Sequence, residues 1–410
     1  MAIDNKDKKV LKSSIEREQN EVACSAECEK IKGSKNLNVP PLRFPEFTEE
    51  WKAEQLDNIA TLSKGIGISK EQLSEDGEPC ILYGELYTKY KSEIIKQVES
   101  KTDINGSKLK RSKANDVIIP CSGETAVDIA TARCVPFDNI LFGGGLNVIS
   151  LHQYDGAFMS YQLNGKRKYD IARVAQGVSI VHLYGEHLKA IKTYNPTLPE
   201  QQKIAKLLSL LDDRIDTQNK IIEKLQSLIK GIAQHCIKES TSGNTYVKLG
   251  DICQITTGKL DANAQVDNGI YPFFTCAEQP FKIDSFAFDT EALLISGNGA
   301  NLGYINYYKG KFNAYQRTYV LDLFSENIQY IKWALKVLLP KRIAIEKSSS
   351  NTPYIVLSTL TDLRLPIPCK SKQSFIANLM QSLERKLSNQ IAQYDSYNYL
   401  KQYLLRQMFI

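Results

Sequence analysis

Pro199-Glu200-Gln201-Gln202-Lys203-Ile204 opens the stretch of sequence that decides the fold. After it, apolar residues recur at alternating steps of four and three, the spacing of a helix that packs along one seam. The recurring positions are Ile204, Leu208, Leu211, Ile215, Ile222, Leu225, Ile229, Ile232 and Cys236, interrupted only at Gln218. The pattern predicts a helix over 199–240, about 40 residues and roughly 60 Å long, which exceeds what one compact domain needs.

A second helix of the same phase is predicted over 371–410, with a weaker and more aromatic seam. Its positions are Ile376, Met380, Leu383, Leu387, Gln390, Tyr394, Tyr397, Lys401, Leu404 and Met408. We expect the two helices to pair antiparallel within the chain, with Gln218 and Gln390 facing each other near the middles and fixing the register. Two alternatives remain open: each helix packs on its own domain, or the protein dimerises through its helices.

The segments outside the helices repeat each other. Residues 56–65 parallel 249–258 with the closing glycine in register, and 116–123 parallel 291–297, each ending in Ser-Gly. Repeated segments in the same order indicate two copies of one module, which fits a chain of 410 residues. The predicted organisation is a polar, flexible extension over 1–38, a first module over 39–198, and a second module over 241–370.

Each module is predicted to be α+β, with short strands and frequent turns. Strands are expected near 79–83, 140–142 and 304–308, and a short helix near 329–339. At the start of the first module, 39–47 contains prolines and phenylalanines, and Trp51 follows. These residues are expected to rigidify and anchor the chain where order begins.

The composition indicates a cytoplasmic protein. No apolar run approaches the roughly 20 residues of a spanning helix, and the N-terminus lacks a secretory pattern. The nine cysteines include no Cys-x-x-Cys pair, so neither a disulfide framework nor a zinc site is expected. The net charge of +6 is compatible with a polyanionic partner but does not require one.

No catalytic site is predicted. The sequence has neither a Gly-x-x-x-x-Gly-Lys-Ser/Thr phosphate loop nor an Asn/Asp-Pro-Pro-aromatic pattern. The glycines of 297–303 have the wrong spacing for a dinucleotide loop and favour a tight turn. His182 and His187 are expected to be structural, and Glu384-Arg385-Lys386 belongs on the solvated face of a helix.

Two copies of a module, joined by long helices of opposite direction, suit a ligand of twofold symmetry such as DNA. Each module would read one short half-site, and helix length would set the unread spacer. Lysines and arginines would neutralise phosphates, whereas base reading needs arginine, asparagine, glutamine or serine. In the first module the candidates are Lys166, Arg167, Lys168 and Arg173 for phosphates, with Gln176 and Ser179 nearer the bases. In the second they are Lys341, Arg342 and Lys347 for phosphates, with Asn298, Gln316, Arg317, Ser349 and Asn351 as readers.

Particular segments resemble the specificity subunits of type I restriction-modification enzymes. The segment 41–47 with Trp51 looks like the start of that family's first recognition domain. Residues 198–205 and the continuation Leu211-Asp212-Asp213-Arg214-Ile215 look like its central conserved region. The second helix departs from the pattern, because Ser371-Lys372-Gln373-Ser374 stands where Pro-Glu-Gln-Gln is usual.

The resemblance, which covers about residues 40 to 410, implies two tandem target-recognition domains separated by two long helices in an antiparallel coiled coil. It also implies a non-catalytic chain that binds double-stranded DNA and positions two adenine-methylating modification subunits together with restriction subunits that translocate. S-adenosylmethionine, ATP and Mg would then be bound by those partners, and no metal or cofactor by this chain. The alternatives are a DNA-binding scaffold that dimerises through its helices and a nuclease with an unrecognised site.

Overall fold

The computed structural model describes residues 38–105, 108–177, 180–240, 245–347 and 354–410. The predicted extension over 1–38 therefore lies almost entirely outside the described residues. The chain forms two compact units. We call 38–219 together with Ala392–Ile410 the N-terminal unit, and Lys220–Ile391 the C-terminal unit.

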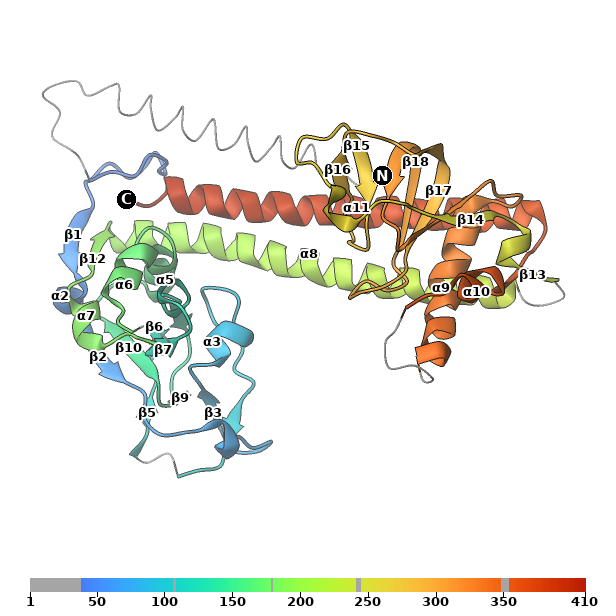
Figure 1. Cartoon of the computed structure of the whole chain (residues 1–410). Helices are drawn as coiled ribbons and strands as arrows, with labels where there is room; N and C mark the ends of the chain where they lie inside the picture. The colour runs from blue at the N-terminus through green and yellow to red at the C-terminus, as the bar shows by residue number, and fades with distance from the viewer. Residues whose placement is uncertain (1–37, 106–107, 178–179, 241–244, 348–353) are drawn as a thin grey trace, which may run out of the picture. The chain divides into compact units, whose positions relative to one another are not determined.

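The first long helix, α8 (Leu198–Glu239), runs without a break from one unit into the other (Figure 1). Most of its predicted seam is buried: Ile204, Leu208, Leu211, Ile222, Leu225 and Ile229. Towards its end Ala233 and Ile237 are buried instead, and Ile232 and Cys236 are only half-buried. A helix of 3.6 residues per turn drifts away from a 3.5-residue repeat, which accounts for this shift of the seam.

The second long helix, α11 (Lys370–Gln407), pairs antiparallel with α8 inside each unit. In the N-terminal unit, Leu404 and Met408 share a buried cluster with Ile204 and Leu208. In the C-terminal unit, Lys372 Nζ donates to the carbonyl of Glu239 at 3.0 Å. The predicted antiparallel pairing is confirmed. Gln218 is buried and Gln390 half-buried, and their role in fixing the register stays a prediction.

The N-terminal unit is built on small sheets whose strands are antiparallel except for the parallel pair β3 and β9. The main sheet has the order β2-β10-β6-β8: Ala60–Lys64, Leu146–Leu151, Asp116–Pro120 and Arg133–Val135. A second has the order β4-β3-β9-β5: Lys101–Thr102, Glu78–Ile81, Leu141–Phe142 and Lys110–Arg111. Two further pairs are β1 (Lys52–Gln55) with β12 (Lys192–Asn195), and β7 (Ser122–Gly123) with β11 (Val181–His182). The short helices are α2 (Leu56–Ile59), α3 (Glu85–Thr88), α4 (Ala126–Ile129), α5 (Gly156–Asn164), α6 (Lys168–Val174) and α7 (Gly185–Lys189).

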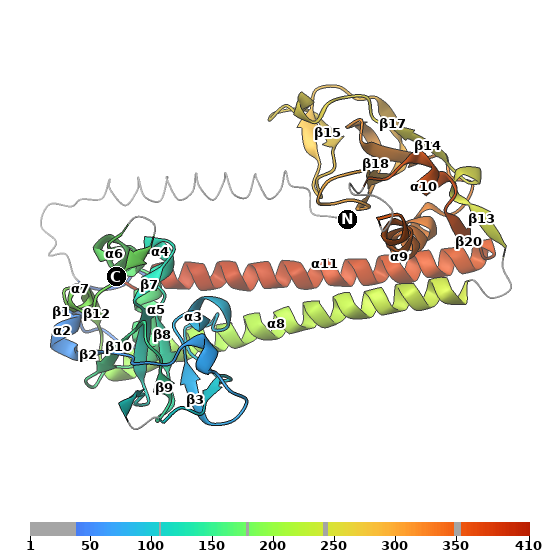
Figure 2. The same cartoon turned by 60° about the horizontal axis from the view of Figure 1, so that its bottom comes forward.

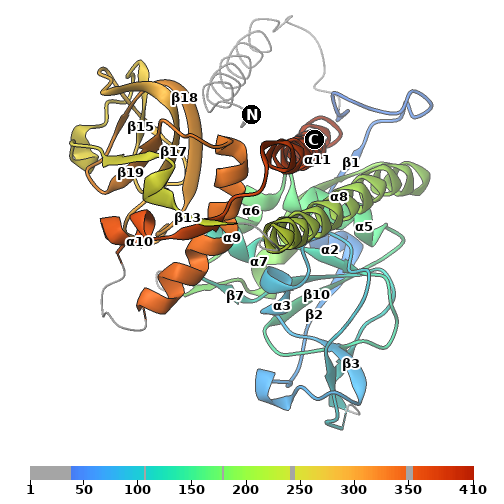
Figure 3. The same cartoon turned by 90° about the vertical axis from the view of Figure 1, so that its right-hand side faces the viewer.

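The C-terminal unit has one larger sheet in the order β14-β19-β17-β18-β15-β16. The strands are Gln254–Thr257, Thr318–Asp322, Phe288–Ser296, Ile305–Ala314, Tyr271–Phe274 and Phe281–Ile283, and β13 (Tyr246–Lys248) pairs separately with β20 (Arg364–Pro366). Helix α9 (Ile328–Lys347) lies along β17 and β18 (Figure 3), and α10 (Leu357–Thr361) follows it. The predicted helix ended before Pro340, but α9 continues through this residue to Lys347.

Both units bury their sheets against helices. In the C-terminal unit, Trp333 and Leu335 of α9 share a core cluster with Leu225 and Ile229 of α8 and with Met380 of α11. Helix α9 lies beside the first half of α11 (Figure 2), where Lys332 Nζ donates to Glu384 at 2.8 Å. The long helices are therefore part of each unit's core. The predicted α+β class with two modules and a helical pair is confirmed.

The start of the first module, where the sequence predicts an anchor of prolines and aromatic residues, is held to α8 by a buried ion pair as well. Arg43 Nε and Nη2 donate to the two carboxylate oxygens of Glu200, each at 2.7 Å. Trp51 Nε1 donates to the same carboxylate at 3.3 Å, and the Glu200 side chain is 0% exposed. A bidentate pair of this kind fixes both position and orientation, so it ties the start of the module to the first turn of α8.

Candidate nucleic-acid interface

In the C-terminal unit, the turn before β19 meets two other segments where β17 ends and β19 begins. The amide of Gly297 donates to the carbonyl of Arg317 at 2.8 Å, and the amide of Ile355 donates to the carbonyl of Gly297 at 2.9 Å. The hydroxyl of Tyr319 also donates to the carbonyl of Ile355 at 2.8 Å. We call this hydrogen-bonded set the frame: Gly297, Arg317, Tyr319 and Ile355. The turn, the end of β17 and the start of 354–356 are therefore held together by hydrogen bonds.

Three of the predicted readers gather at this frame. Gln316 and Arg317 are exposed, and they line a hollow of about 300 Å³ with Gly297, Tyr319 and Ile355. Asn298 follows Gly297 directly, and its Oδ1 accepts a hydrogen bond from Cys276 Sγ at 3.0 Å. Burial raises the pKa of Tyr319, and the nearby charge of Arg317 opposes the rise. The predicted readers Ser349 and Asn351 lie outside the described residues.

The N-terminal unit repeats this frame with other residues. The amide of Cys121 donates to the carbonyl of Gly145 at 2.7 Å, and the amide of Leu183 donates to the carbonyl of Cys121 at 2.8 Å. Asn147 Nδ2 closes the frame on the carbonyl of Leu183 at 3.0 Å. Cys121, Gly145 and Leu183 therefore correspond to Gly297, Arg317 and Ile355. Asn147 corresponds to Tyr319.

Strand register corrects one detail of the sequence repeat. Leu146 pairs with Pro120 in the N-terminal unit, and Thr318 pairs with Ser296 in the C-terminal unit. Pro120 thus corresponds to Ser296, and the predicted match of the two Ser-Gly pairs is wrong by two residues. The match of Gly65 with Gly258 is confirmed, because the amide of Gly65 donates to Leu146 and that of Gly258 to Thr318. In both places a Cβ would collide with a carbonyl of the facing turn.

The surface around the N-terminal frame is aromatic, and the sequence did not single it out. Tyr83 covers Gly145, Lys64 Nζ lies 5.9 Å from the ring centre of Tyr184, and His182 stacks on Tyr184 with ring centres 6.2 Å apart. Tyr87 adds a hydroxyl that donates to the carbonyl of Ser122 at 3.0 Å. The available signal was the three consecutive glycines over 143–145, which the sequence indicated only as a turn.

The basic cluster predicted in the first module is partly engaged within the protein. Arg167 Nη2 donates to the carbonyl of Ile410 at 3.1 Å, Nη1 lies 3.1 Å from Asp170, and its guanidinium lies over Tyr194. Burial lowers the pKa of Lys166, as do the charges of Arg167 and Arg406. The structure therefore places this cluster beside the end of α11.

The other candidates of the first module lie in two places. Arg173 is 76% exposed but pairs with Asp170 at 2.9 Å, and Lys168 is half-buried at the start of α6. Gln176 lies nearer the aromatic surface, because its backbone exchanges hydrogen bonds with that of His182. Ser179 lies outside the described residues. As contacts to DNA, all of these residues stay predictions.

The basic candidates of the second module lie on α9. Lys341 is exposed, whereas Arg342 Nε lies 2.8 Å from Glu346, whose other oxygen accepts a hydrogen bond from Thr359 at 2.7 Å. Lys347 ends the helix, and its side chain lies outside what the structure describes. These residues are separated along the chain from the turn that carries Gln316 and Arg317.

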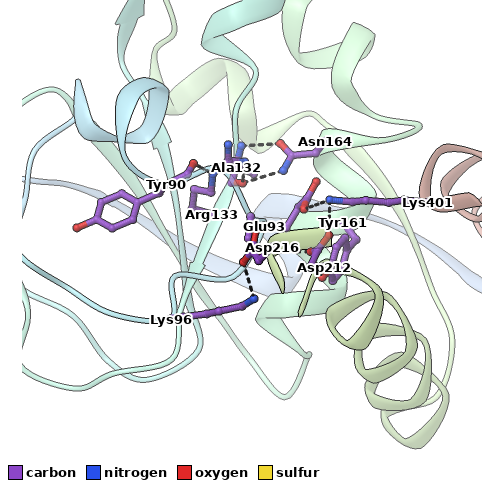
Figure 4. Close-up of polar contacts among 11 residues, drawn as sticks. Tyr90, Glu93, Lys96, Ala132, Arg133, Tyr161, Asn164, Asp212, Asp216 and Lys401 are labelled. Atoms are coloured by element: carbon purple, nitrogen blue, oxygen red, sulfur yellow. Dashed lines mark hydrogen bonds and ion pairs between the residues drawn. The ribbon is translucent and has the colours of Figure 1, made fainter. Parts of the chain in front are cut away.

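A buried polar network ties the N-terminal frame's sheet to both long helices (Figure 4). Lys401 Nζ lies 2.6 Å from Glu93 and 2.7 Å from Asp212, and the Tyr161 hydroxyl donates to Asp212 at 2.7 Å. Burial alone lowers the pKa of Lys401, but Glu93 and Asp212 outweigh it and raise the pKa. Arg133 on β8 donates to the carbonyl of Tyr90 at 2.8 Å. The network fixes the sheet of this unit on its helices.

Over the described residues, no group of three or more histidine, cysteine or acidic side chains is placed to hold a metal ion. His182 stacks on the ring of Tyr184, and His187 packs against the same ring in a T-shaped arrangement. Glu384 bonds Lys332 and Lys336 across α9 and α11 and is half-buried, so its predicted place on the solvated face is wrong. Arg385 and Lys386 are exposed, as predicted. No described helix is long and apolar enough to cross a membrane.

The fold and the two frames define a class: a protein of two homologous recognition modules joined by a pair of long helices. The chain belongs to the family described as type I restriction modification DNA specificity domain, whose family model matches residues 48–227 and again 241–394. The two matched stretches each contain one of the two frames.

Individual relatives agree with this assignment. The chain is 44% identical over 137 residues to the type I restriction enzyme EcoDI specificity subunit of Escherichia coli, covering 33% of this chain and 30% of that protein. It is 23% identical over 401 residues to the MjaVIII specificity subunit of Methanocaldococcus jannaschii, covering 84% of this chain and 87% of that one. The match to the MjaIX subunit of the same organism spans 59% of that protein.

Solved structures share the fold. A type I restriction-modification S subunit from M. genitalium superposes with a TM-score of 0.64 at 20% identity, covering 91% of this chain and 99% of that one. A chain from a type I system, studied for complex assembly and conformational transition, gives a TM-score of 0.55 at 16% identity over 90% and 99% of the two chains.

Proposed function

We propose that this chain reads double-stranded DNA for a type I restriction-modification complex, with one half-site of a two-part target bound by each unit. The observation that carries the proposal is the frame that occurs twice, in the same hydrogen-bond register, with different exposed side chains at its edge. The same backbone arrangement with different exposed side chains is suited to two half-sites of different sequence, because side chains that contact base edges specify the sequence. The length of α8 and α11 sets the unread spacer.

In this proposal the chemistry belongs to partner subunits. Two methyltransferase subunits, positioned by this chain, modify adenine with S-adenosylmethionine, and restriction subunits use ATP and Mg to translocate and cleave. The chain itself binds DNA, catalyses nothing and works in the cytoplasm, where these partners meet cellular DNA. Its relatives' names as specificity subunits support this division.

The alternative scaffold that dimerises through its helices has less support. The seam of each long helix is already occupied inside each unit: Leu404 and Met408 pack with Ile204 and Leu208, and Met380 with Ile229. A dimer formed through the same seam would have to break these buried contacts. The measured mass of the purified chain distinguishes the two cases.

The decisive experiment is a genome-wide map of adenine methylation in the source cell, with and without the gene. We expect a two-part motif with a fixed spacer to lose its methylation when the gene is deleted, and to regain it on complementation. Unchanged methylation in a cell whose partner genes are expressed contradicts the proposal.

A further inference from the structure

Strand pairing in the two units brings a second pair of corresponding residues to the frame. The amide of Gly143 donates to the carbonyl of Ile81 at 2.9 Å, and the amide of Tyr315 donates to the carbonyl of Phe274 at 2.9 Å. Strand β3 also pairs in parallel with β9 as β15 does with β18. Two residues further along, Tyr83 therefore corresponds to Cys276, just as Gly145 corresponds to Arg317.

In each unit one residue of this pair is large and the other is small, but the large residue stands at different positions in the two units. In the N-terminal unit, the ring of Tyr83 packs on Gly145, and a Cβ at Gly145 would lie 2.8 Å from Tyr83 Cδ1. Gly145 has φ of 83°, a conformation that disfavours any larger residue. In the C-terminal unit, the small Cys276 faces Arg317, with its Sγ 3.6 Å from the Arg317 carbonyl. One large and one small side chain occupy the frame in each unit, in opposite order.

The large side chain is exposed in both cases. Tyr83 is 42% exposed, and Arg317 is exposed beside Gln316 at the hollow. Within the described part of the chain, neither the Tyr83 hydroxyl nor the Arg317 guanidinium has a hydrogen bond or ion pair. By contrast, Arg43, Arg111 and Arg133 of the same chain are all engaged with protein partners. A guanidinium left unpaired at the edge of a rigid frame is suited to an external ligand.

We propose that one pair of positions in each unit determines which base its half-site requires. The pair is Tyr83 and Gly145 in the N-terminal unit, and Cys276 and Arg317 in the C-terminal unit. Arg317 reads guanine in one half-site through two parallel hydrogen bonds, and Gln316 supports it at the neighbouring base. Tyr83 reads the other half-site through an apolar contact of the kind that a thymine methyl group accepts. An arginine fork matches two acceptors of guanine in the major groove, whereas an aromatic ring offers no such donors. Cys276 acts as a positioning residue, because its small size leaves room for Arg317 and its thiol holds Asn298. This proposal rests on the proposed function.

The test compares methylation motifs written in the source cell by variants of the complete chain. We expect Arg317→Ala to lose discrimination at one guanine in one half of the motif, by roughly 10- to 100-fold, and to leave the other half unchanged. Arg317→Lys keeps the charge but not the fork, so it loses the same discrimination. Tyr83→Ala alters only the other half, and Tyr83→Phe retains the original preference. Arg364→Ala, an exposed arginine on β20, is the matched control and changes neither half.

The positioning role of Cys276 is tested separately. Cys276→Tyr introduces the large residue of the other unit, so we expect the guanine preference to be lost as in Arg317→Ala, whereas Cys276→Ser retains it. Urea denaturation of both variants shows whether the fold survives, and Arg317→Ala decides the question if Cys276→Tyr does not fold. If the unmodified chain writes no two-part motif, the proposed function fails. If it writes one and Arg317→Ala leaves both halves unchanged, the specificity assignment alone is overturned.

Discussion

Gln201 and Gln373 occupy the same place at the starts of α8 and α11 and make two matching hydrogen bonds. Gln201 accepts a hydrogen bond from the amide of Asp155 at 2.9 Å and donates to the carbonyl of Pro196 at 2.8 Å. Gln373 accepts from the amide of Asn327 at 3.0 Å and donates to the carbonyl of Pro368 at 2.9 Å. Each glutamine thus links the long helix to the residue immediately before a shorter helix of its own unit, α5 or α9.

Removing either glutamine is expected to destabilise the unit that contains it. Both side chains are buried, so Gln201→Ala or Gln373→Ala leaves an amide and a carbonyl without a partner, at a cost of about 1–3 kcal/mol each. Urea denaturation of the purified chain measures the loss. The matched control is Gln202→Ala, because Gln202 is exposed on the same turn. Equal losses for Gln201→Ala and Gln202→Ala contradict the role of the buried contacts.

The matching hydrogen bonds show which contacts the second helix retains although its sequence departs from Pro-Glu-Gln-Gln. Of Ser371-Lys372-Gln373-Ser374, the glutamine carries the contacts that Gln201 makes in the first helix. The residues on either side differ in role: Glu200 binds Arg43, whereas Lys372 donates to the carbonyl of Glu239. The neighbours of the glutamine vary between the two helices, whereas two of its hydrogen bonds are shared; Gln373 Nε2 adds a third to Glu326 at 2.6 Å.

Lys401 interrupts the apolar seam of α11 because it neutralises two buried carboxylates. Lys401→Met removes the cation shared by Glu93 and Asp212, and we expect a loss of about 3–5 kcal/mol in the free energy of unfolding. Lys206→Met, at an exposed position of α8, is the control and changes stability little. Adding Glu93→Gln and Asp212→Asn to Lys401→Met is expected to recover part of the loss, because no unpaired charge then remains buried. A triple variant less stable than Lys401→Met contradicts this account.

Glu384 gives the C-terminal unit a stability that depends on pH. Burial alone raises the pKa of this carboxyl, but Lys332 and Lys336 outweigh it and lower the pKa below its ordinary 4.5. The ionised form is therefore favoured by folding, and its contribution is present above pH 4.5 and is lost as pH falls further. We expect Glu384→Gln to be less stable than the unmodified chain at neutral pH, and the difference to shrink below pH 4.5. Glu239→Gln, exposed on α8, is the control; a difference independent of pH contradicts the prediction.

Sequence periodicity predicts the long helices and their pairing, because the seam residues are local and regularly spaced. The hydrogen bonds of the two frames could not be predicted from the sequence, because each frame joins segments that are distant in the chain. Gln316, Arg317 and Asn298 were predicted from their side-chain chemistry alone, and the frame brings them together. Tyr83 was missed because its partner is a glycine on another strand, and no local pattern reveals a contact with Gly145.

The salt dependence of DNA binding separates Lys64 from the basic cluster first predicted for this unit. Lys64 is exposed beside Tyr184 at the recognition frame, so under the proposed function Lys64→Gln removes about one phosphate contact and flattens the slope of log affinity against log salt by roughly 0.9. Arg167 is held by Asp170 and the carbonyl of Ile410, so we expect Arg167→Gln to lower stability and leave the slope unchanged. Lys113→Gln, exposed elsewhere in the unit, controls for the loss of one charge. If Arg167→Gln flattens the slope and Lys64→Gln leaves it unchanged, the DNA-binding surface of this unit lies at 166–173 and not at Lys64.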